Sequence, residues 1–337
     1  MSPRVLALVP PSGPGILPQT RLLGLPLARR TVLAAPRAGF SRVVVVGADA
    51  ALAAALDGAG ADLAAAAPPD AVRLPWNVVV HVKDLRALAN GAREAGVPVT
   101  GAADVPRAEK HLLRGLIKDE EGFMSRHLDR SISLAVSRRL ANTSVTPNQM
   151  TYVAVLIGLV GAPFFLSARP AVQVVGGILF LLHSIIDGCD GELARLKFQE
   201  SRWGGVLDFW GDNVVHVAVF AAMGTGLARQ LGKAWPAWCG IAAVVATFAS
   251  AYTVYRRTMT GPKEGPLYTS VATHSDTPLS RLTDAVSRRD FIYLVLIMSI
   301  FGVADWFVIS SAIMIPVYFL ALLVIAWNDR RVARSAA

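Results

Sequence analysis

Four aspartates in an otherwise apolar stretch are the residues of this chain best suited to chemistry. Asp187 and Asp190 lie three residues apart, so both would lie on one face of a helix. Asp208 and Asp212 lie four residues apart and would share a face in the same way. A carboxylate at the centre of a membrane-spanning helix costs at least about 2.5–3.5 kcal/mol, so four of them require a compensating cation. Because Mg²⁺ and Mn²⁺ prefer carboxylate oxygens, the group predicts a divalent metal site within a membrane.

The residues around these aspartates fit a large anionic ligand. If the two aspartate-bearing helices are antiparallel neighbours, the carboxylate pairs face each other, and two metal ions about 3.5–4 Å apart would clamp the oxygens of a phosphoryl transfer. Gly191 and Ala194 leave room for a ligand against one helix, and Gly204 does so on the facing helix. Arg195 offers a guanidinium to a phosphate. Two other interpretations of the aspartates stay open, namely satisfied polar partners and a proton relay.

Strongly apolar segments surround the aspartates and must position them. The 337-residue chain is 53% hydrophobic, above the roughly 45–50% of soluble domains, and the excess lies after residue 148. A hydrocarbon core of about 30 Å needs about 20 residues per helix, and the fifth of six apolar segments is short by this measure. We expect six transmembrane helices, at Gln149–Ala168, Pro170–Ile186, Gly204–Ala228, Ala234–Tyr255, Phe291–Ala304 and Trp306–Trp327.

The distribution of basic residues predicts the orientation. The N-terminal apolar run, Val5–Val9, is too short for a signal-peptide core, so we expect the N-terminus in the cytoplasm. The loops on that side would then carry most of the basic residues, as the positive-inside rule requires. The opposite side would keep only Arg169, Arg229 and Lys233. The prediction is a multi-pass protein of the inner, cytoplasmic membrane, with both termini and the aspartates at the cytoplasmic face.

The first part of the chain predicts a separate soluble domain. Residues 1–105 contain three short β-branched runs, at 5–9, 42–47 and 77–82. Stretches of helical character, Pro26–Ala38 and Ala50–Leu56, lie between them. Strands that alternate with helices indicate a parallel sheet. We therefore expect a small cytoplasmic α/β domain of Rossmann-like type.

A basic linker joins this domain to the apolar segments. Within residues 106–147, an apolar stripe that includes Leu128, Ile132 and Leu140 is flanked by arginines. This pattern predicts an amphipathic helix on the membrane surface, with an ordinary linker helix packed on the soluble domain as the alternative. The expected divisions are 1–105, 106–147, a transmembrane domain at 148–330 and a cytoplasmic tail at 331–337.

The net charge of +9 suits an anionic membrane leaflet or an anionic substrate. Aromatic residues are not interleaved with arginine as in a nucleic-acid platform. The expected partners are therefore membrane lipid and an anionic substrate, and no nucleic acid.

The motif D-x-x-D-G-x-x-A-R-x8-G-x3-D-x3-D, which begins at Asp187 and ends at Asp212, resembles the signature of the CDP-alcohol phosphotransferase (CDP-alcohol phosphatidyltransferase) family. The segments T-P-N (146–148) and S-R-R-D-F (287–291) are also similar. The resemblance covers about residues 140–330 and implies a homodimeric membrane enzyme. Such enzymes move the substituted phosphate of a CDP-alcohol to the hydroxyl of a second alcohol and release CMP.

The resemblance also implies residue roles. Asp187, Asp190 and Asp208 would bind two Mg²⁺ or Mn²⁺ ions. Asp212 would be both a ligand and the base that deprotonates the acceptor. The expected CDP-binding residues are Gly191, Ala194, Arg195, Gly204, Pro147 and Asn148.

Segment 24–47 resembles the early part of a sugar-nucleotidyltransferase domain, although Leu25 stands where that family has a lysine. The N-terminal domain is therefore interpreted as a degenerate, inactive relative that serves as a scaffold or regulatory lobe, with a surviving nucleotide-binding role or active catalysis as the alternatives. The fusion resembles archaeal-type bifunctional enzymes that couple CDP-inositol to inositol phosphate. This implies inositol phosphate or a related polyol as acceptor, with CDP-diacylglycerol or CDP-inositol as donor, in phospholipid or inositol-phosphodiester synthesis.

The acceptor pocket is the least defined part of this prediction. Asn213 follows the fourth aspartate, where many inositol-phosphate-handling members have arginine. The candidates for an acceptor phosphate are Arg202, Arg256, Arg257, Arg288 and Arg289, and positive-inside topology would explain the same arginines. His183 and His216 are expected to be satisfied core histidines, or else partners of the aspartates. The alternative function is a non-catalytic membrane transporter or scaffold with a divalent-cation site.

Overall fold

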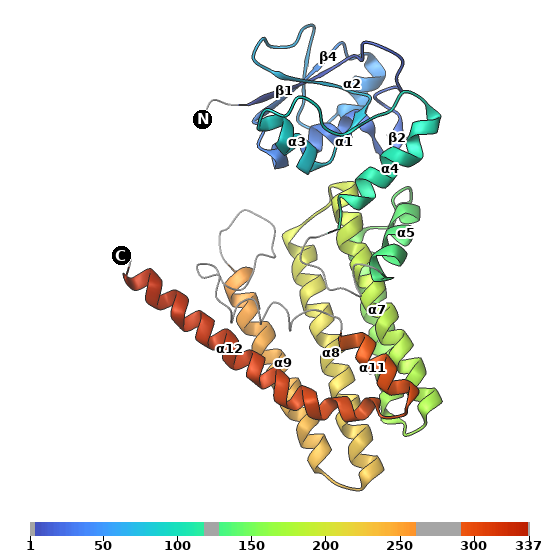
Figure 1. Ribbon diagram of the computed structural model, residues 1–337, viewed down its shortest axis with the longest axis vertical. Coiled ribbons are helices and arrows are strands. Elements are labelled where there is room, and N and C mark those ends of the chain that lie inside the picture. The colour runs from blue at the N-terminus through green and yellow to red at the C-terminus, as the bar shows by residue number, and fades with distance from the viewer. Residues whose placement is uncertain (1–3, 118–127, 261–290, 336–337) are drawn as a thin grey trace. The chain divides into compact units, whose positions relative to one another are not determined.

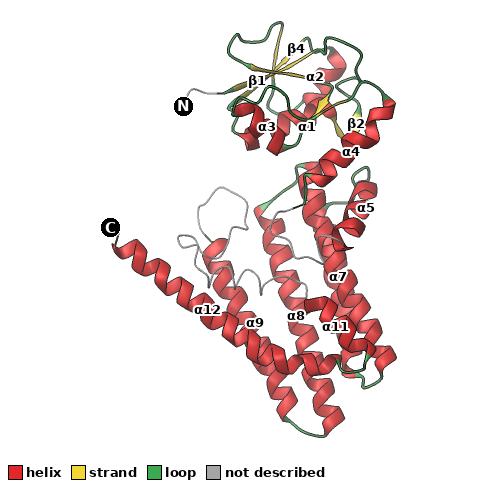
Figure 2. Cartoon of the chain, viewed as in Figure 1, coloured by secondary structure: helices red, strands yellow, loops and turns green. Residues whose placement is uncertain are grey.

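The computed structural model describes residues 4–117, 128–260 and 291–335, with side chains in the last range up to 328. The chain divides into two compact units (Figures 1 and 2). Unit 1 comprises Met1–Asp119, Val136–Ser144 and Glu192–Gln199. Unit 2 comprises Glu120–Ala135, Val145–Gly191 and Glu200–Ala337.

The first unit is built on a parallel sheet, as its alternating pattern predicts. Its strands, in the spatial order β5-β4-β1-β6, are all parallel neighbours. They are β5 (Asp62–Ala64), β4 (Arg42–Val46), β1 (Val5–Val9) and β6 (Val72–Pro75). Two short antiparallel pairs flank the sheet: β2 (Arg21–Leu22) with β3 (Leu25–Pro26), and β7 (Val78–Val79) with β8 (Val97–Pro98).

Two helices of this unit fall on the predicted stretches: α1 (Leu27–Ala34), with a 3₁₀ turn at Pro36–Ala38, and α2 (Ala50–Leu56). Two further helices, α3 (Val82–Ala89) and α4 (Val105–Arg114), and a 3₁₀ turn at Ala102–Asp104 were not predicted. The core between helices and sheet holds Leu6, Leu8 and Val45 from the strands and Val32 and Leu85 from the helices. The α/β expectation for this part of the chain is therefore confirmed.

The third expected strand, at 77–82, was wrong in its extent and its pairing. The strand beside β1 is β6, and the run 77–82 contributes only the two residues of β7. The physical reason is a helix start inside the run. His81 and Asp84 form a reciprocal capping box, in which the Asp84 carboxylate accepts from the His81 backbone N–H at 2.7 Å. This box begins α3 at Val82 and ends the extended conformation.

The second unit is helical, and five of its helical segments are long and apolar enough to cross a membrane. They are Pro147–Leu166, Pro170–Lys197, Arg202–Leu231, Trp235–Thr258 and Ala304–Asn328. In these segments lie α6 (Pro147–Gly161) with a 3₁₀ turn at Ala162–Leu166, α7 (Pro170–Lys197), α8 (Arg202–Leu231), α9 (Trp235–Thr258), a 3₁₀ turn at Ala304–Trp306, and α12 (Phe307–Ser335).

The fifth expected span, Phe291–Ala304, is shorter than predicted among the described residues. The helix α11 (Phe291–Ile300) has ten residues, which span about 15 Å, or half of a hydrocarbon core of about 30 Å.

The juxtamembrane helix α5 covers Arg130–Leu140. Its buried side chains are Ser133 and Ser137, whereas Leu128, just before it, and Ile132 are each 48% exposed. Placement of this helix at a membrane surface stays a prediction.

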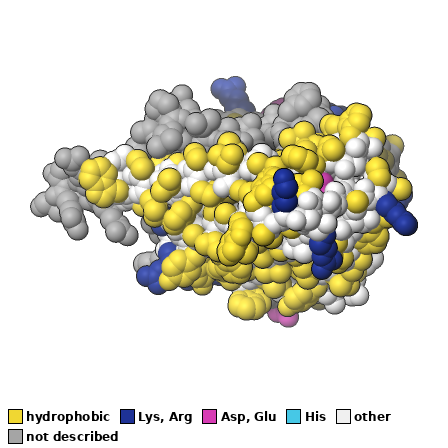
Figure 3. Space-filling model, turned by 90° about the horizontal axis from the view of Figure 1, so that it is seen from below, with side chains coloured by type: hydrophobic (Ala, Val, Ile, Leu, Met, Phe, Trp, Pro, Cys, Tyr) yellow, Lys and Arg dark blue, Asp and Glu magenta, His cyan; other side chains and the backbone are white. Residues whose placement is uncertain are grey.

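The helix α8 lies at the centre of the second unit. Its Val215, Val219 and Met223 are fully buried in a core shared with Phe180 and Val295. Hydrophobic side chains cover most of the described surface in the view of Figure 3, and exposed ones on α9 and α12 include Trp238, Ile241, Val245, Val317 and Leu320. Such a surface is typical of helices that face lipid.

Candidate metal and nucleotide site

Two consecutive helices carry the four aspartates. Asp187 and Asp190 lie in α7, which continues without interruption to Lys197. Asp208 and Asp212 lie in α8, whose N-cap is Ser201; the Ser201 side chain accepts a hydrogen bond from the backbone N–H of Gly204 at 3.0 Å. The connection between the two helices is short, from Phe198 to Ser201.

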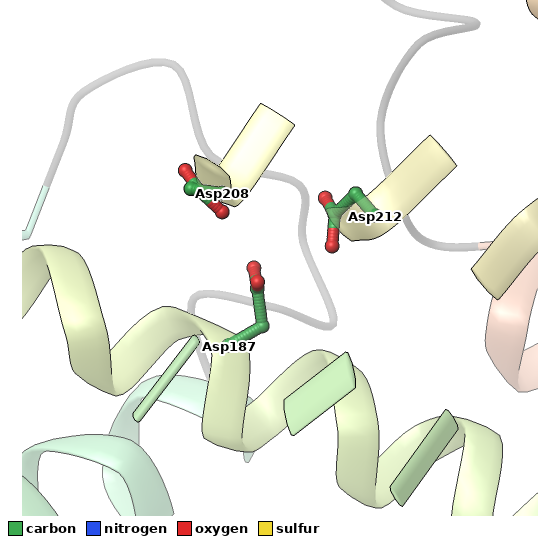
Figure 4. A group of neighbouring side chains, drawn as sticks. All are labelled: Asp187, Asp208 and Asp212. Carbon is green, nitrogen blue, oxygen red and sulfur yellow. The ribbon is translucent and has the colours of Figure 1, made fainter. Parts of the chain in front are cut away.

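Three of the four carboxylates converge. Asp187, Asp208 and Asp212 each offer one oxygen, and these oxygens all lie within 4.8 Å of one another. Asp187 points from α7 toward the two aspartates of α8 (Figure 4). The expectation that the two helices turn their carboxylates toward each other is confirmed for these three residues. A donor set made only of carboxylate oxygens suits a hard divalent cation.

Asp190 is buried beside this group, and its carboxylate is held by neighbouring donors. The Thr151 hydroxyl, from α6, donates to one Asp190 oxygen, and the backbone N–H of Gly191 donates to the other. Its role as a metal ligand stays a prediction. Thr151 was missed in the sequence, although a threonine four residues after Pro147 in an apolar helix is a weak signal of a polar partner.

His183 connects α6 to Asp212. Its ring is almost fully buried, and Nδ1 lies 2.9 Å from the Ala154 carbonyl oxygen. Since a carbonyl oxygen only accepts, Nδ1 carries a hydrogen in this arrangement. Nε2 lies 3.5 Å from Oδ1 of Asp212. His183 is thus both a buried core histidine and a partner of an aspartate.

The starts of α6 and α8 meet at the residues expected to bind the nucleotide. A Cβ added at Gly204 would lie 3.1 Å from Oδ1 of Asn148. Pro147 is the first residue of α6, after a capping box in which the Thr146 hydroxyl accepts from the Gln149 backbone N–H at 3.4 Å. Gly191, Ala194 and Arg195 are half-buried on α7. Their contacts with a nucleotide stay predictions.

Three of the five arginines expected to bind an acceptor phosphate lie among the described residues. Arg202 donates to the backbone carbonyl of Met259. Arg256 is exposed and Arg257 half-buried, both in the last turn of α9. Arg288 and Arg289 lie outside the described residues. Asn213 turns back on its own helix, because its Nδ2 donates to the Phe209 carbonyl at 2.7 Å.

Comparison with known families matches this part of the chain. Residues 144–275 match the family model described as CDP-alcohol phosphatidyltransferase. The match covers α6 to α9, and with them all four aspartates, His183 and the expected nucleotide residues. The resemblance seen in the sequence motif is therefore shown for this domain.

Curated relatives align over parts of the chain. A bifunctional IPC transferase and DIPP synthase from Thermococcus kodakarensis is 42% identical over 121 residues, which are 36% of this chain and 27% of the relative. The protein of the same name from Rubrobacter xylanophilus is 34% identical over 50% of this chain and 39% of the relative. The archaetidylinositol phosphate synthase of Pyrococcus horikoshii is 30% identical over 27% of this chain and 47% of the relative. The chain thus spans well under half the length of the bifunctional relatives it matches.

A solved structure, that of phosphatidylinositol phosphate synthase from Mycobacterium tuberculosis with CDP-DAG bound, aligns at 18% identity and a TM-score of 0.39. The alignment covers 56% of this chain and 92% of that one.

Proposed function

We propose, from the premise that residues 144–275 form a domain of the CDP-alcohol phosphatidyltransferase family, that this chain is a membrane transferase acting on a CDP-alcohol. It moves the substituted phosphate of the donor to the hydroxyl of a second alcohol. The acceptor oxygen bonds to phosphorus while the pyrophosphate bond breaks, and CMP leaves. The observation that carries the proposal is the group of three carboxylates, Asp187, Asp208 and Asp212, which two helices of this domain bring together.

The aspartates are proposed to have the roles that the family resemblance implies. Asp187, Asp190 and Asp208 would hold the metal, and Asp212 would both hold the metal and take the proton of the acceptor hydroxyl. His183, at 3.5 Å from Asp212, keeps that carboxylate in place through its own bond to Ala154. When bound, two Mg²⁺ or Mn²⁺ ions would neutralise the pyrophosphate and lower the pKa of the acceptor hydroxyl.

The donor binds along the last turns of α7 and the starts of α6 and α8. Arg195 pairs with a phosphate of the CDP group, and the small side chains leave the helix backbones accessible. The other residues proposed to bind the CDP group are Gly191, Ala194, Gly204, Pro147 and Asn148. The close approach of Asn148 to Gly204 supports a shared binding surface there.

The substrates we propose are a CDP-diacylglycerol or CDP-inositol donor and an inositol phosphate or related polyol acceptor. The names of relatives that align with the domain, the IPC transferase and DIPP synthase and the archaetidylinositol phosphate synthase, support this class. We place both termini and the site at the cytoplasmic face of the inner membrane and expect a homodimer. The basic residues at the ends of α7 and α9 support that orientation.

A panel of CDP-alcohols against candidate acceptors tests the function. Purified protein in detergent or lipid discs, with Mg²⁺ or Mn²⁺, should release CMP only when a suitable donor and acceptor are both present. Inositol, inositol phosphate and glycerol phosphate would separate charged from uncharged acceptors. Absence of CMP release with every pair would contradict the proposed function.

Calorimetry with CDP and Mg²⁺ separates this enzyme from a transporter or scaffold with a cation site. An enzyme of this class should bind CDP in a Mg²⁺-dependent manner, whereas a non-catalytic cation site should bind the metal alone. Binding of Mg²⁺ without any affinity for CDP would favour the non-catalytic alternative.

A further inference from the structure

The end of α7 has an unusual backbone conformation. Phe198 follows the last helical residue with φ of +56°, in the left-handed region that glycine normally occupies at this position. The backbone N–H of Gln199 bonds to the Ala194 carbonyl at 2.9 Å, which closes the helix as in a Schellman motif. A phenylalanine held in this conformation needs compensating contacts, because its Cβ crowds the backbone there.

Those contacts come from other segments of unit 1. The Phe198 side chain packs against the core between the parallel sheet and its helices. The guanidinium of Arg37 lies 4.6 Å from the centre of its ring, and that of Arg30 lies 5.9 Å from it. Both distances are within the range of cation–π attraction. Phe198 thus anchors the end of α7 in the N-terminal fold.

Arg30 bonds to the same helix end directly. Its side chain is 3% exposed, and Nη1 donates to the Leu196 carbonyl at 2.9 Å. Nη2 donates to the carbonyls of Leu22 and Leu23 at 2.8 and 3.0 Å. Burial lowers the pKa of Arg30 to about 10, so the guanidinium is charged at neutral pH. A buried cation at a helix C-terminus satisfies carbonyls that have no partner within the helix and interacts favourably with the helix dipole.

A tight turn completes the contact. Leu23 and Gly24, between β2 and β3, both have positive φ. A Cβ at Gly24 would lie 2.1 Å from the carbonyl oxygen of Ala141, which follows α5. The turn therefore packs closely against the end of α5, and the carbonyls of Leu22 and Leu23 accept hydrogen bonds from Arg30.

Two of these contacts are made by the residues directly before and after Arg195, which is expected to bind a donor phosphate. Arg195 lies between Ala194 and Leu196, whose carbonyls are bonded to Gln199 and Arg30. Burial lowers the pKa of His81, Asp84 acts in the opposite direction, and nearby positive groups, Arg195 the last of them, add to the lowering.

We propose that Arg30 and Phe198 are positioning residues for the donor site, and that the N-terminal fold acts through them by holding the last turn of α7 so that Arg195 meets the donor phosphate. This inference rests on the proposed function. In this role, the N-terminal fold supports binding of the donor without catalysing a reaction on a nucleotide itself.

Hydrogen exchange and CDP binding on the full-length protein test this inference together. Arg30→Gln removes the bonds to the helix end. Phe198→Gly keeps a residue that accepts the backbone conformation and removes only the anchoring side chain. Arg29→Gln is the matched control, since Arg29 also donates to two carbonyls, of Ala55 and Asp57, at the end of α2.

Both test variants should speed amide exchange in a peptide covering residues 192–200 by about tenfold and weaken Mg²⁺-dependent CDP binding by about tenfold, as the loss of charge-assisted bonds predicts. The KM for the donor should rise while the KM for the acceptor stays unchanged. The control should leave the exchange of this peptide and the affinity for CDP as in the unmodified protein.

The outcomes separate the two proposals. Unchanged exchange in both test variants would overturn the inference whatever the activity. Faster exchange with unchanged CDP affinity would also overturn it, because the contact would then not position the donor site. If the unmodified protein binds no CDP, the proposed function fails together with the donor role, whereas the exchange data alone still decide whether Arg30 and Phe198 hold the helix end.

Discussion

Asp212 lies near both the other carboxylates of the site and a buried histidine. It lies with Asp187 and Asp208 in the carboxylate group, and its Oδ1 is also 3.5 Å from Nε2 of His183. One oxygen can face the metal while the other receives a proton, because a carboxylate accepts at both oxygens. This position is compatible with both proposed roles of Asp212, as a ligand and as a base.

Replacing this base should reduce turnover more than binding. Asp212→Asn keeps the shape of the side chain but cannot take a proton, so CMP release should fall by about 10²–10⁴-fold. Mg²⁺-dependent CDP binding should persist, measured by calorimetry. Glu200→Gln, which removes an exposed carboxylate between α7 and α8, is the control and should release CMP normally. Near-normal CMP release by Asp212→Asn would contradict the assignment of the base.

His183 allows a sharper test of how Asp212 is held. Asn in place of His183 can still donate to the Ala154 carbonyl but offers nothing where Nε2 faces Asp212. We expect His183→Asn to retain the stability of the protein and to lose about 10–100-fold in kcat, a typical effect of losing a partner of a metal ligand. His183→Ala should lose activity to the same extent and unfold at a lower temperature. Full activity in both variants would show that Asp212 needs no support from this ring.

At the scale of elements, the contact between α6 and α8 depends on glycine. A Cβ at Gly158 would lie 2.5 Å from Cγ1 of Val215 and 3.1 Å from Cγ of His183. A Cβ at Gly211 would lie 2.6 Å from Cγ2 of Val155. Small residues let helix backbones approach closely in membrane proteins. Two further contacts join α6 to α7: the Thr151 hydroxyl donates to Asp190, and the Ala154 carbonyl lies beside Nδ1 of His183.

A methyl group at this contact should damage both packing and the site. Gly158→Ala forces Val215 or His183 to move, so we expect a loss of about 1–3 kcal/mol in stability, as for overpacked cores. CMP release should fall as well, because His183 would shift relative to Asp212. The control is Leu156→Ala on the same helix, where the side chain is 63% exposed and its removal should change neither quantity. Thermal unfolding in detergent and the CMP assay are the measurements. Unchanged activity in a stable Gly158→Ala protein would contradict the link between this contact and the site.

At the scale of the whole molecule, we expect the function of the site to depend on a cation more than the fold does. The core around α8 is apolar and contains none of the three clustered aspartates. Removal of metal should therefore leave the helices folded while it exposes three carboxylates to one another's charge. Function and folding should respond differently to a chelator.

Chelation tests this difference. Excess EDTA should abolish CMP release, and Mg²⁺ or Mn²⁺ should restore it. The helical circular dichroism signal, recorded on the same samples, should change little, which separates loss of the cofactor from loss of the fold. Activity that persists after chelation would remove the case for a metal-dependent reaction.

What the sequence determined by itself is local. Helical spacing places Asp187 with Asp190 and Asp208 with Asp212, because the periodicity of a helix depends on nothing beyond the helix. Apolar runs of about 20 residues likewise predict membrane spans without reference to their neighbours. The helix at Ala50–Leu56 and the strand at Val5–Val9 were predictable for the same reason, since each has a local pattern with clear ends.

Only the tertiary structure decided which side chains meet across the chain. Thr151 and Asp190 are 39 residues apart, and Arg30 and Leu196 are 166 apart. Such partners depend on how whole helices pack, and no spacing in the sequence encodes that packing. The same holds for β6, which was not predicted and pairs with β1, because strand pairing depends on contacts between distant segments. Local periodicity therefore determined the chemistry of the aspartates, and long-range packing decided what holds them.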